Sequence, residues 1–495
     1  MLPAHIFEQL PQEIYECILG HLESSFEAGS YVDASGLQRQ LKALCLVSKG
    51  WARVAVEHLY RELWLPSAVP TSKRKLSMSR QKSKMDMLLR TLTDAPDLAF
   101  LVCRIHVTKL LSGELAGSNG QHATRLLQNV VERCTGVQAV TGFNPPASSD
   151  HTSYYKALMS QSRLSAHAWL LDPQQTPVFP VSQFVDLHGH WQWLDTLALC
   201  NTGLSGLSVG TGLLTAVTNK LWSLKHLMVS GFSKNDFHNG TLLSLPPLQS
   251  LRLEKLAGVT DQGIEQLALS RIAFSLQSLS LVDLNVSSLR TIQAVFARLP
   301  HLLRFRLVQD STPALLVGAH PSSKRAVLAC STLRHLHWDT LFPGPAVEAI
   351  ANSIAADNFP SLRTLKAPSD YDGALQELCR PISQQALTAD DLEYLGSVDQ
   401  DHFVRSLRLS KLQAQLRIRE SRQQPSFNLV VEDEEEHVQH THVIGSYLGD
   451  MQSKIEYSLE PDVEGSEEAL ASVEDVVRPR LVGLGERKVH FKVLF

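Results

Sequence analysis

One short segment has the residue pattern of a serine hydrolase. Gly206-Leu207-Ser208-Val209-Gly210 matches the Gly-x-Ser-x-Gly motif, in which the serine is a nucleophile. Such a serine needs a strand before it and a helix directly after it, whereas Ser208 lies in a stretch rich in glycine and serine. We therefore expect a loop here. Because no other segment offers a catalytic set of residues, the sequence predicts that the protein is not an enzyme.

A second segment carries side chains that could ligate a metal ion. His437, His440 and His442 follow the three glutamates 434–436, and such groups are common metal ligands. Their spacing fits no specific metal site, so we expect an exposed polar stretch, no metal and no cofactor. The seven cysteines are dispersed and include no Cys-x-x-Cys pair, which indicates reduced thiols in an intracellular protein.

The overall composition is that of a folded, nearly neutral protein. The 495 residues include 46 basic and 50 acidic side chains, which argues against a dedicated nucleic-acid binder. No apolar stretch is long enough to span a bilayer, and the first residues do not resemble a signal peptide. We expect a cytoplasmic or nuclear protein without membrane contact. Residues 73–84, within a basic linker at 66–96, could be a nuclear-import signal or simply solvated chain.

The N-terminal residues predict short amphipathic helices. Leu10, Ile14 and Ile18 recur every four residues, and Pro11 suits the first turn of a helix. A second apolar stripe runs through residues 41–51 and ends at Trp51. Helices of this length are not stable alone in water, so they must pack on each other or on a partner. They could be a helical cap on the following domain or a docking segment.

The order and spacing of these residues resemble an F-box, of the kind found in fungal F-box proteins with leucine-rich repeats. The resemblance covers residues 8–65: Leu-Pro-x-Glu-Ile-x-x-x-Ile-Leu-x-x-Leu from residue 10, then Leu-x-x-Val-Ser-x-x-Trp from residue 44. It implies docking on the adaptor subunit of a cullin–RING ubiquitin ligase. The adaptor-binding residues that it implies are Leu10, Pro11, Ile14, Ile18, Leu19, Leu44, Val47 and Trp51. The chain departs from the family pattern in a longer insert, rich in serine and glycine, at residues 23–40.

A Leu-x-x-Leu-x-Leu pattern recurs through the middle of the chain. Its copies begin at Leu194, Leu224, Leu248, Leu276, Leu302, Leu333 and Leu362, at intervals of 24 to 31 residues. This spacing is typical of leucine-rich repeats, in which each unit must stack on its neighbours to bury its apolar face. We predict an α/β fold: a leucine-rich-repeat solenoid over residues 97–385, with a curved parallel sheet and helices outside. Residues 143–190 are expected to be an irregular excursion.

Strand geometry also predicts which side chains project from the concave face of the sheet. In the later repeats these positions form a basic cluster: Arg252, Arg304, Arg306, His335, His337 and Lys366. Only Glu254 and Asp339 oppose it. One hypothesis is that the cluster binds an acidic or phosphorylated segment of a target protein, because arginine side chains match carboxylate and phosphate geometry. The alternatives are a solvated face or arginines paired with neighbouring acids.

The C-terminal part predicts a helical cap at residues 386–424 and an acidic, partly disordered tail at 425–495. Within the tail, residues 488–493 alternate like a strand. Together with the resemblance, these features favour a non-enzymatic substrate receptor of an F-box-containing ubiquitin ligase. It would bind the adaptor subunit through the F-box and an unidentified target protein through the repeats. The alternative is a repeat-type interaction scaffold with no role in ubiquitin transfer.

Overall fold

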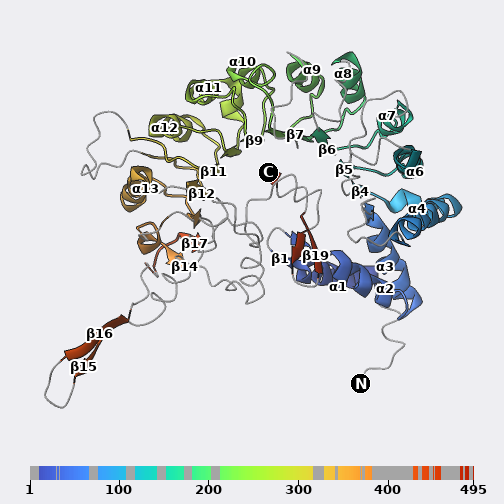
Figure 1. Cartoon of the computed structure of the whole chain (residues 1–495), viewed down its shortest axis with the longest axis horizontal. Coiled ribbons are helices and arrows are strands. Elements are labelled where there is room, and N and C mark those ends of the chain that lie inside the picture. Colours follow the sequence, from blue (N-terminus) through green and yellow to red (C-terminus); the bar gives the residue numbers. More distant parts are fainter. Residues whose placement is uncertain are drawn as a thin grey trace. The chain divides into compact units, whose positions relative to one another are not determined.

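The computed structural model (Figure 1) describes residues 11–28, 31–32, 34–65, 76–107, 118–141, 152–171, 181–201, 212–315, 328–340, 344–367, 370, 374–381, 427–432, 438–444, 450, 452–458, 480–482, 485–489 and 494–495. These residues fall into two compact units. The first unit lies within residues 1–248, 256–258 and 471–495, and the second within 249–255 and 259–470. No helix in the described ranges is long and apolar enough to cross a membrane.

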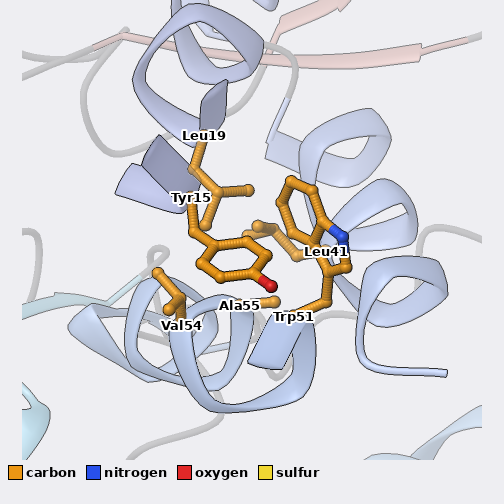
Figure 2. Close-up of a cluster of buried hydrophobic side chains, with 6 residues drawn as sticks. All are labelled: Tyr15, Leu19, Leu41, Trp51, Val54 and Ala55. Carbon is orange, nitrogen blue, oxygen red and sulfur yellow. The ribbon is translucent and has the colours of Figure 1, made fainter. Parts of the chain in front are cut away.

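The first unit begins with three helices: α1 (Gln12–Ser25), α2 (Ala34–Leu44) and α3 (Lys49–Arg61). Ser48 caps α3, because its hydroxyl accepts a hydrogen bond from the backbone N–H of Trp51 at 3.3 Å. The apolar stripes pack on each other around Tyr15 and Trp51, whose rings meet edge to face at 4.8 Å (Figure 2). The other buried members of this core are Leu19, Leu41, Val54 and Ala55.

The insert at residues 23–40 contains two strands of a small antiparallel sheet. Strands β1 (Glu27–Ala28) and β2 (Tyr31–Val32) form an antiparallel hairpin, and α2 begins within the insert at Ala34. Strand β19 (Gly485–Val489) pairs with β2, and β18 (Arg480–Val482) pairs with β19. The strand-like alternation seen from residue 488 onward is thus partly explained: Lys488 and Val489 lie opposite Val32 and Tyr31.

A series of parallel strands follows the helices in the first unit. They are β3 (Glu62–Leu65), β4 (Arg104–Val107), β5 (Ala139–Thr141), β6 (Ala166–Leu171), β7 (Thr196–Asn201) and β8 (His226–Ser230), each paired with the next. The segments between them hold α4 (Leu76–Asp94), α5 (Pro96–Leu101), α6 (Ser118–Arg133), α7 (Thr152–Met159), α8 (Val181–Gly189), α9 (Leu213–Lys220) and, after β8, α10 (Asn239–Leu243). The strand series therefore begins at residue 62, inside the F-box-like segment.

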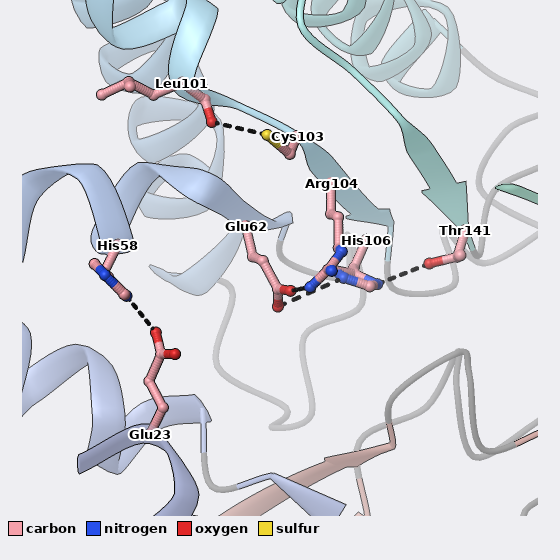
Figure 3. Close-up of polar contacts among 8 residues, drawn as sticks. All are labelled: Glu23, His58, Glu62, Leu101, Cys103, Arg104, His106 and Thr141. Atoms are coloured by element: carbon pink, nitrogen blue, oxygen red, sulfur yellow. Dashed lines mark hydrogen bonds and ion pairs between the residues drawn. The ribbon is translucent and has the colours of Figure 1, made fainter. Parts of the chain in front are cut away.

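Polar contacts hold the first elements in place (Figure 3). The His58 ring in α3 donates a hydrogen bond from Nδ1 to the Glu23 carboxylate in α1 at 2.6 Å. Glu62 of β3 forms an ion pair with Arg104 of β4. In the next strand along, the Thr141 hydroxyl lies 2.8 Å from Nδ1 of His106. These contacts join α1 to α3 and link the first three strands, β3, β4 and β5, to one another.

The expectation of an irregular excursion at residues 143–190 is wrong. This region contains α7, β6 and α8, so it supplies a regular unit of the series. The leucine pattern is hidden here because His167 and Trp169 occupy inward positions that Leu197 and Leu199 fill in β7. Both side chains are fully buried, as the leucines are.

The second unit repeats the same arrangement. Its parallel strands are β9 (Ser250–Glu254), β10 (Ser278–Val282), β11 (Arg304–Gln309), β12 (His335–Thr340) and β13 (Thr364–Lys366). Between them lie α11 (Asp261–Leu267), α12 (Leu289–Arg298) and α13 (Pro345–Ala355). The inward leucines at 251, 253, 279, 281 and 307 are fully buried. This confirms the predicted α/β solenoid of parallel strands and connecting helices.

An unexpected strand extends the sheet of the second unit. Strand β17 (Glu456–Ser458) lies between β13 and the short β14 (Arg380–Pro381). Its Tyr457 is buried, and the hydroxyl lies 3.0 Å from the Ala367 carbonyl oxygen and 3.2 Å from the Asp370 carboxylate. The region 425–495 therefore supplies part of the solenoid sheet, as well as the hairpin of β15 (Phe427–Glu432) and β16 (Val438–Ile444). The expected helical cap at 386–424 lies outside the described residues.

Candidate functional site

The residues of the F-box pattern divide into a core set and an exposed set. Leu19 and Trp51 are buried in the three-helix core, and Leu44 is half-buried against it. A buried side chain cannot contact a partner directly, so Leu19 and Trp51 support the helices, whereas Leu44 is partly accessible. Pro11, Ile14, Ile18 and Val47 are exposed. Leu10 lies outside the described residues.

The exposed set gains one residue that the sequence analysis missed. Leu46, in the turn between α2 and α3, is 88% exposed, and the adjacent Val47 is 63% exposed. On α1, Ile14 and Ile18 lie on one side of the helix, because residues four apart share a face, and this exposed side adjoins the buried side that carries Tyr15 and Leu19. We refer to Pro11, Ile14, Ile18, Leu46 and Val47 as the docking surface. The sequence could have revealed Leu46, because residues 44–47 are four apolar residues in a row and one face of a helix cannot bury all of them.

The six predicted basic residues of the repeats lie in register on neighbouring strands. Arg252, Ser280, Arg306, His337 and Lys366 are successive lateral partners on β9 to β13. Arg304 and His335 form the adjacent lateral row between Ser278 and Thr364. The sequence positions therefore do share one face of this sheet.

Burial separates these six side chains. Arg252 is only 1% exposed, and its guanidinium forms an ion pair with Glu254 at 2.9 Å. The alternative of an arginine neutralised by a flanking acid therefore applies to Arg252, and His337 is also buried. Arg304 is exposed, whereas Arg306, His335 and Lys366 are half-buried. The accessible positive charge is concentrated on β11 to β13.

Two further arginines add to the accessible positive charge near β11 to β13. Arg334 and Arg363 precede β12 and β13, and both side chains are exposed. The backbone N–H of Arg363 donates a hydrogen bond to the Arg334 carbonyl oxygen at 2.8 Å, which fixes the two residues side by side. Burial lowers the pKa of His335, and the positive charges of Arg304, Arg306, Arg334 and Arg363 lower it further. We call these four arginines the arginine cluster. The sequence could have revealed Arg334 and Arg363, because an arginine directly precedes the strand in both of these consecutive repeats.

Of the two motifs that resembled chemical sites, residues 206–210 lie outside the described residues and residues 434–442 are described only in part. Ser208 and His437 therefore lie outside the described residues, and His440 and His442 belong to strand β16. Within the described ranges, histidine, cysteine, aspartate and glutamate side chains form no group of three that could hold a metal ion. The free thiols in the described core are at Cys134, Cys200, Cys330 and Cys379.

Comparison with known proteins gives weak structural likenesses. No protein-family model and no curated protein matches the chain. A solved TLR13–ssRNA13 complex shares 14% identity with a TM-score of 0.31, and the match covers 48% of this chain but 30% of that one. A solved complex of Rad7 and Elc1 in yeast shares 13% identity with a TM-score of 0.31, covering 72% of this chain and 88% of that one. Likenesses at this level do not bear on function. By the pairing of its own strands, the chain has an α/β fold like that of a leucine-rich-repeat solenoid.

Proposed function

We propose that the protein is a non-enzymatic substrate receptor of an F-box-containing ubiquitin ligase. One observation supports this most directly: the F-box-like helices complete their own core and still leave the docking surface exposed. Ile14, Ile18, Leu46 and Val47 are large apolar side chains that a monomer gains nothing by exposing. They lie on α1 and on the turn between α2 and α3, and groups of large exposed apolar side chains are typical of interaction sites. The second candidate function is an interaction scaffold whose N-terminal helices bind a partner outside ubiquitin transfer.

Charge on the docking surface should abolish adaptor binding without unfolding the helices. We expect the intact chain to capture the adaptor subunit of a cullin–RING ligase from cells, and Ile14→Asp/Val47→Asp to capture about 10-fold less or none. The matched control is Met87→Asp, which places the same charge on an exposed apolar residue of α4. Capture by neither the intact chain nor the control would favour the scaffold. Equal capture by all three would exclude this docking surface.

The arginine cluster is the proposed site for the target protein. The ion pairs in the described part of the second unit are Arg252–Glu254 and Arg380–Glu456, so Arg304, Arg334 and Arg363 remain outside them. Guanidinium groups form paired hydrogen bonds with carboxylate and phosphate groups. An acidic or phosphorylated segment laid across β11 to β13 would meet three exposed positive charges. We propose that such a segment is what the repeats recognise.

Reversing two of these charges should remove target binding. We expect Arg304→Glu/Arg306→Glu to weaken binding of immobilised phosphoserine peptides about 100-fold, which corresponds to about 2.7 kcal/mol. The control is Arg271→Glu/Arg298→Glu. It makes the same change of charge at two exposed arginines of the second unit that lie outside the strands, Arg271 before β10 and Arg298 at the end of α12. Binding should also weaken as salt rises, because the site is partly exposed. Unchanged binding by the first variant would refute this target site.

A further inference from the structure

The concave face of the first unit is covered, although its residues are expected to project into solvent. Strand alternation turns Leu197, Leu199 and Leu227 toward the helices, and it turns Ala198, Cys200 and Met228 the opposite way. Yet Met228 and Ala198 are 0% exposed, and Cys200 is nearly as buried. In an open solenoid these side chains would face water. Something in the chain itself therefore lies over β7 and β8.

Phe495 contacts this face, and the adjacent Leu494 is buried. Leu494 is 0% exposed, and the ring of Phe495 lies 5.9 Å from the His226 ring at an angle of 60°. His226 is the first residue of β8 and the lateral partner of Thr196 on β7. Burial is the largest cause that lowers the pKa of His226, and this agrees with an imidazole that is partly covered. The contact is aromatic and apolar, unlike the charged surface of the arginine cluster.

The same segment is anchored on the docking helices. Strand β19 pairs with β2 at Lys488–Val32 and Val489–Tyr31, and β2 lies in the insert between α1 and α2. Leu494 follows the anchored Val489 by five residues, a span of at most about 17 Å. A short tether gives a contact that is weak by itself an effective concentration near the millimolar range. Phe495 can therefore remain on the concave face without high intrinsic affinity.

We propose that the concave face at β7 and β8 is a binding site for an extended peptide with adjacent leucine-like and phenylalanine-like side chains. Leu494 and Phe495 are its occupant within the chain, and a partner peptide with the same pair of side chains must displace them. This site shares no residue with the arginine cluster and does not depend on the ligase role. A partner can reach the concave face of the first unit only after Leu494 and Phe495 have left it.

A photo-crosslink tests the contact in the full-length protein. With p-benzoylphenylalanine at position 495, irradiation should join this residue to the proteolytic fragment that contains residues 226–230. The same probe at Phe274, an exposed phenylalanine of the second unit, should not label that fragment. Labelling of the 226–230 fragment should fall when a synthetic peptide of residues 485–495 is added in excess. Crosslinks from position 495 to other fragments only would overturn the proposal.

Peptide binding in trans tests the displacement. A labelled peptide of residues 485–495 should bind the full-length Leu494→Ala/Phe495→Ala variant at least about 10-fold more tightly than the intact chain, because the intact site is occupied. A peptide carrying the same two alanines should not bind, and adding Met228→Glu to the variant should remove binding. Equal affinity for the intact chain and the variant, or binding to neither, would overturn the proposal. Adaptor capture should be the same for both proteins, so this result is independent of the proposed ligase role.

Discussion

Lowering the pH from 7 to 5 is expected to reduce the free energy of unfolding of the first unit by about 4 kcal/mol through two buried histidines. His167 in β6 and His188 in α8 are both fully buried. Burial lowers the pKa of His167 to about 3 and that of His188 to about 4. The nearby His188 contributes further to the lowered pKa of His167.

The hydrogen bonds around these rings explain why they must stay neutral. His188 donates from Nδ1 to the Phe184 carbonyl oxygen at 2.7 Å, so its Nε2 can accept the Trp169 indole N–H at 3.0 Å. Protonation of Nε2 would place two donors against each other. His167 donates from Nδ1 to the Val140 carbonyl oxygen at 3.0 Å, and no described residue offers a hydrogen-bond partner to its Nε2. A second proton on that ring would be buried without an acceptor.

The direction of the pH effect follows from the lowered pKa values. Above about pH 6.5 both histidines are neutral in the folded and unfolded states, so their contribution is fully present. As the pH falls below that value, only the unfolded chain binds the protons, and each histidine removes about 1.4 kcal/mol per pH unit. The loss continues until the pH reaches the folded-state value of about 4 for His188 and about 3 for His167.

Urea unfolding at pH 7 and pH 5 measures this effect. His167→Leu restores the side chain that β7 has at the equivalent position, and it should remove about half of the difference between the two pH values. His190→Leu is the matched control, because this histidine is exposed and its loss should leave the difference unchanged. A His167→Leu protein with the full pH dependence of the intact chain would contradict the assignment.

Truncation of Trp51 to alanine should destabilise the docking helices by about 3–5 kcal/mol. The indole packs edge to face on Tyr15, and the same core holds Leu19, Leu41 and Val54 (Figure 2). Helices of 11 to 14 residues depend on this packing, because they are marginal on their own. The loss of a large central side chain should therefore unfold the three helices together.

Hydrogen exchange resolves that local effect. In Trp51→Ala, amides of residues 12–61 should exchange much faster, whereas amides of the parallel strands in the second unit should not change. The control is Val47→Ala, which removes an exposed side chain of the docking surface and should leave exchange unaffected. Strong protection of α1 to α3 in the Trp51 variant would show that the helices are held by contacts other than their own core.

The leucine pattern was sufficient to predict the architecture, and to place the basic residues on one face. Each Leu-x-x-Leu-x-Leu copy fixes which residues face the helices, so the lateral rows of β9 to β13 follow from sequence spacing. Prediction failed where another side chain filled the leucine's volume. His167 and Trp169 are as fully buried as the leucines of β7, but histidine and tryptophan do not match the leucine pattern of the other repeats. Their unit was therefore mistaken for a loop.

The sequence by itself determined the repeat architecture. It also determined that the docking surface precedes the arginine cluster in the chain. The reason is that periodic apolar residues show which side of each helix or strand is buried. Only the tertiary structure decided which candidate residues remain accessible. Trp51 and Leu19 pack into a core, Arg252 is neutralised by Glu254, and Leu46 and Arg334 are exposed instead. It also brought β17 and β19 from the C-terminal region onto strands far away in the sequence. Burial and pairing of this kind depend on contacts between distant segments, and local spacing does not encode them.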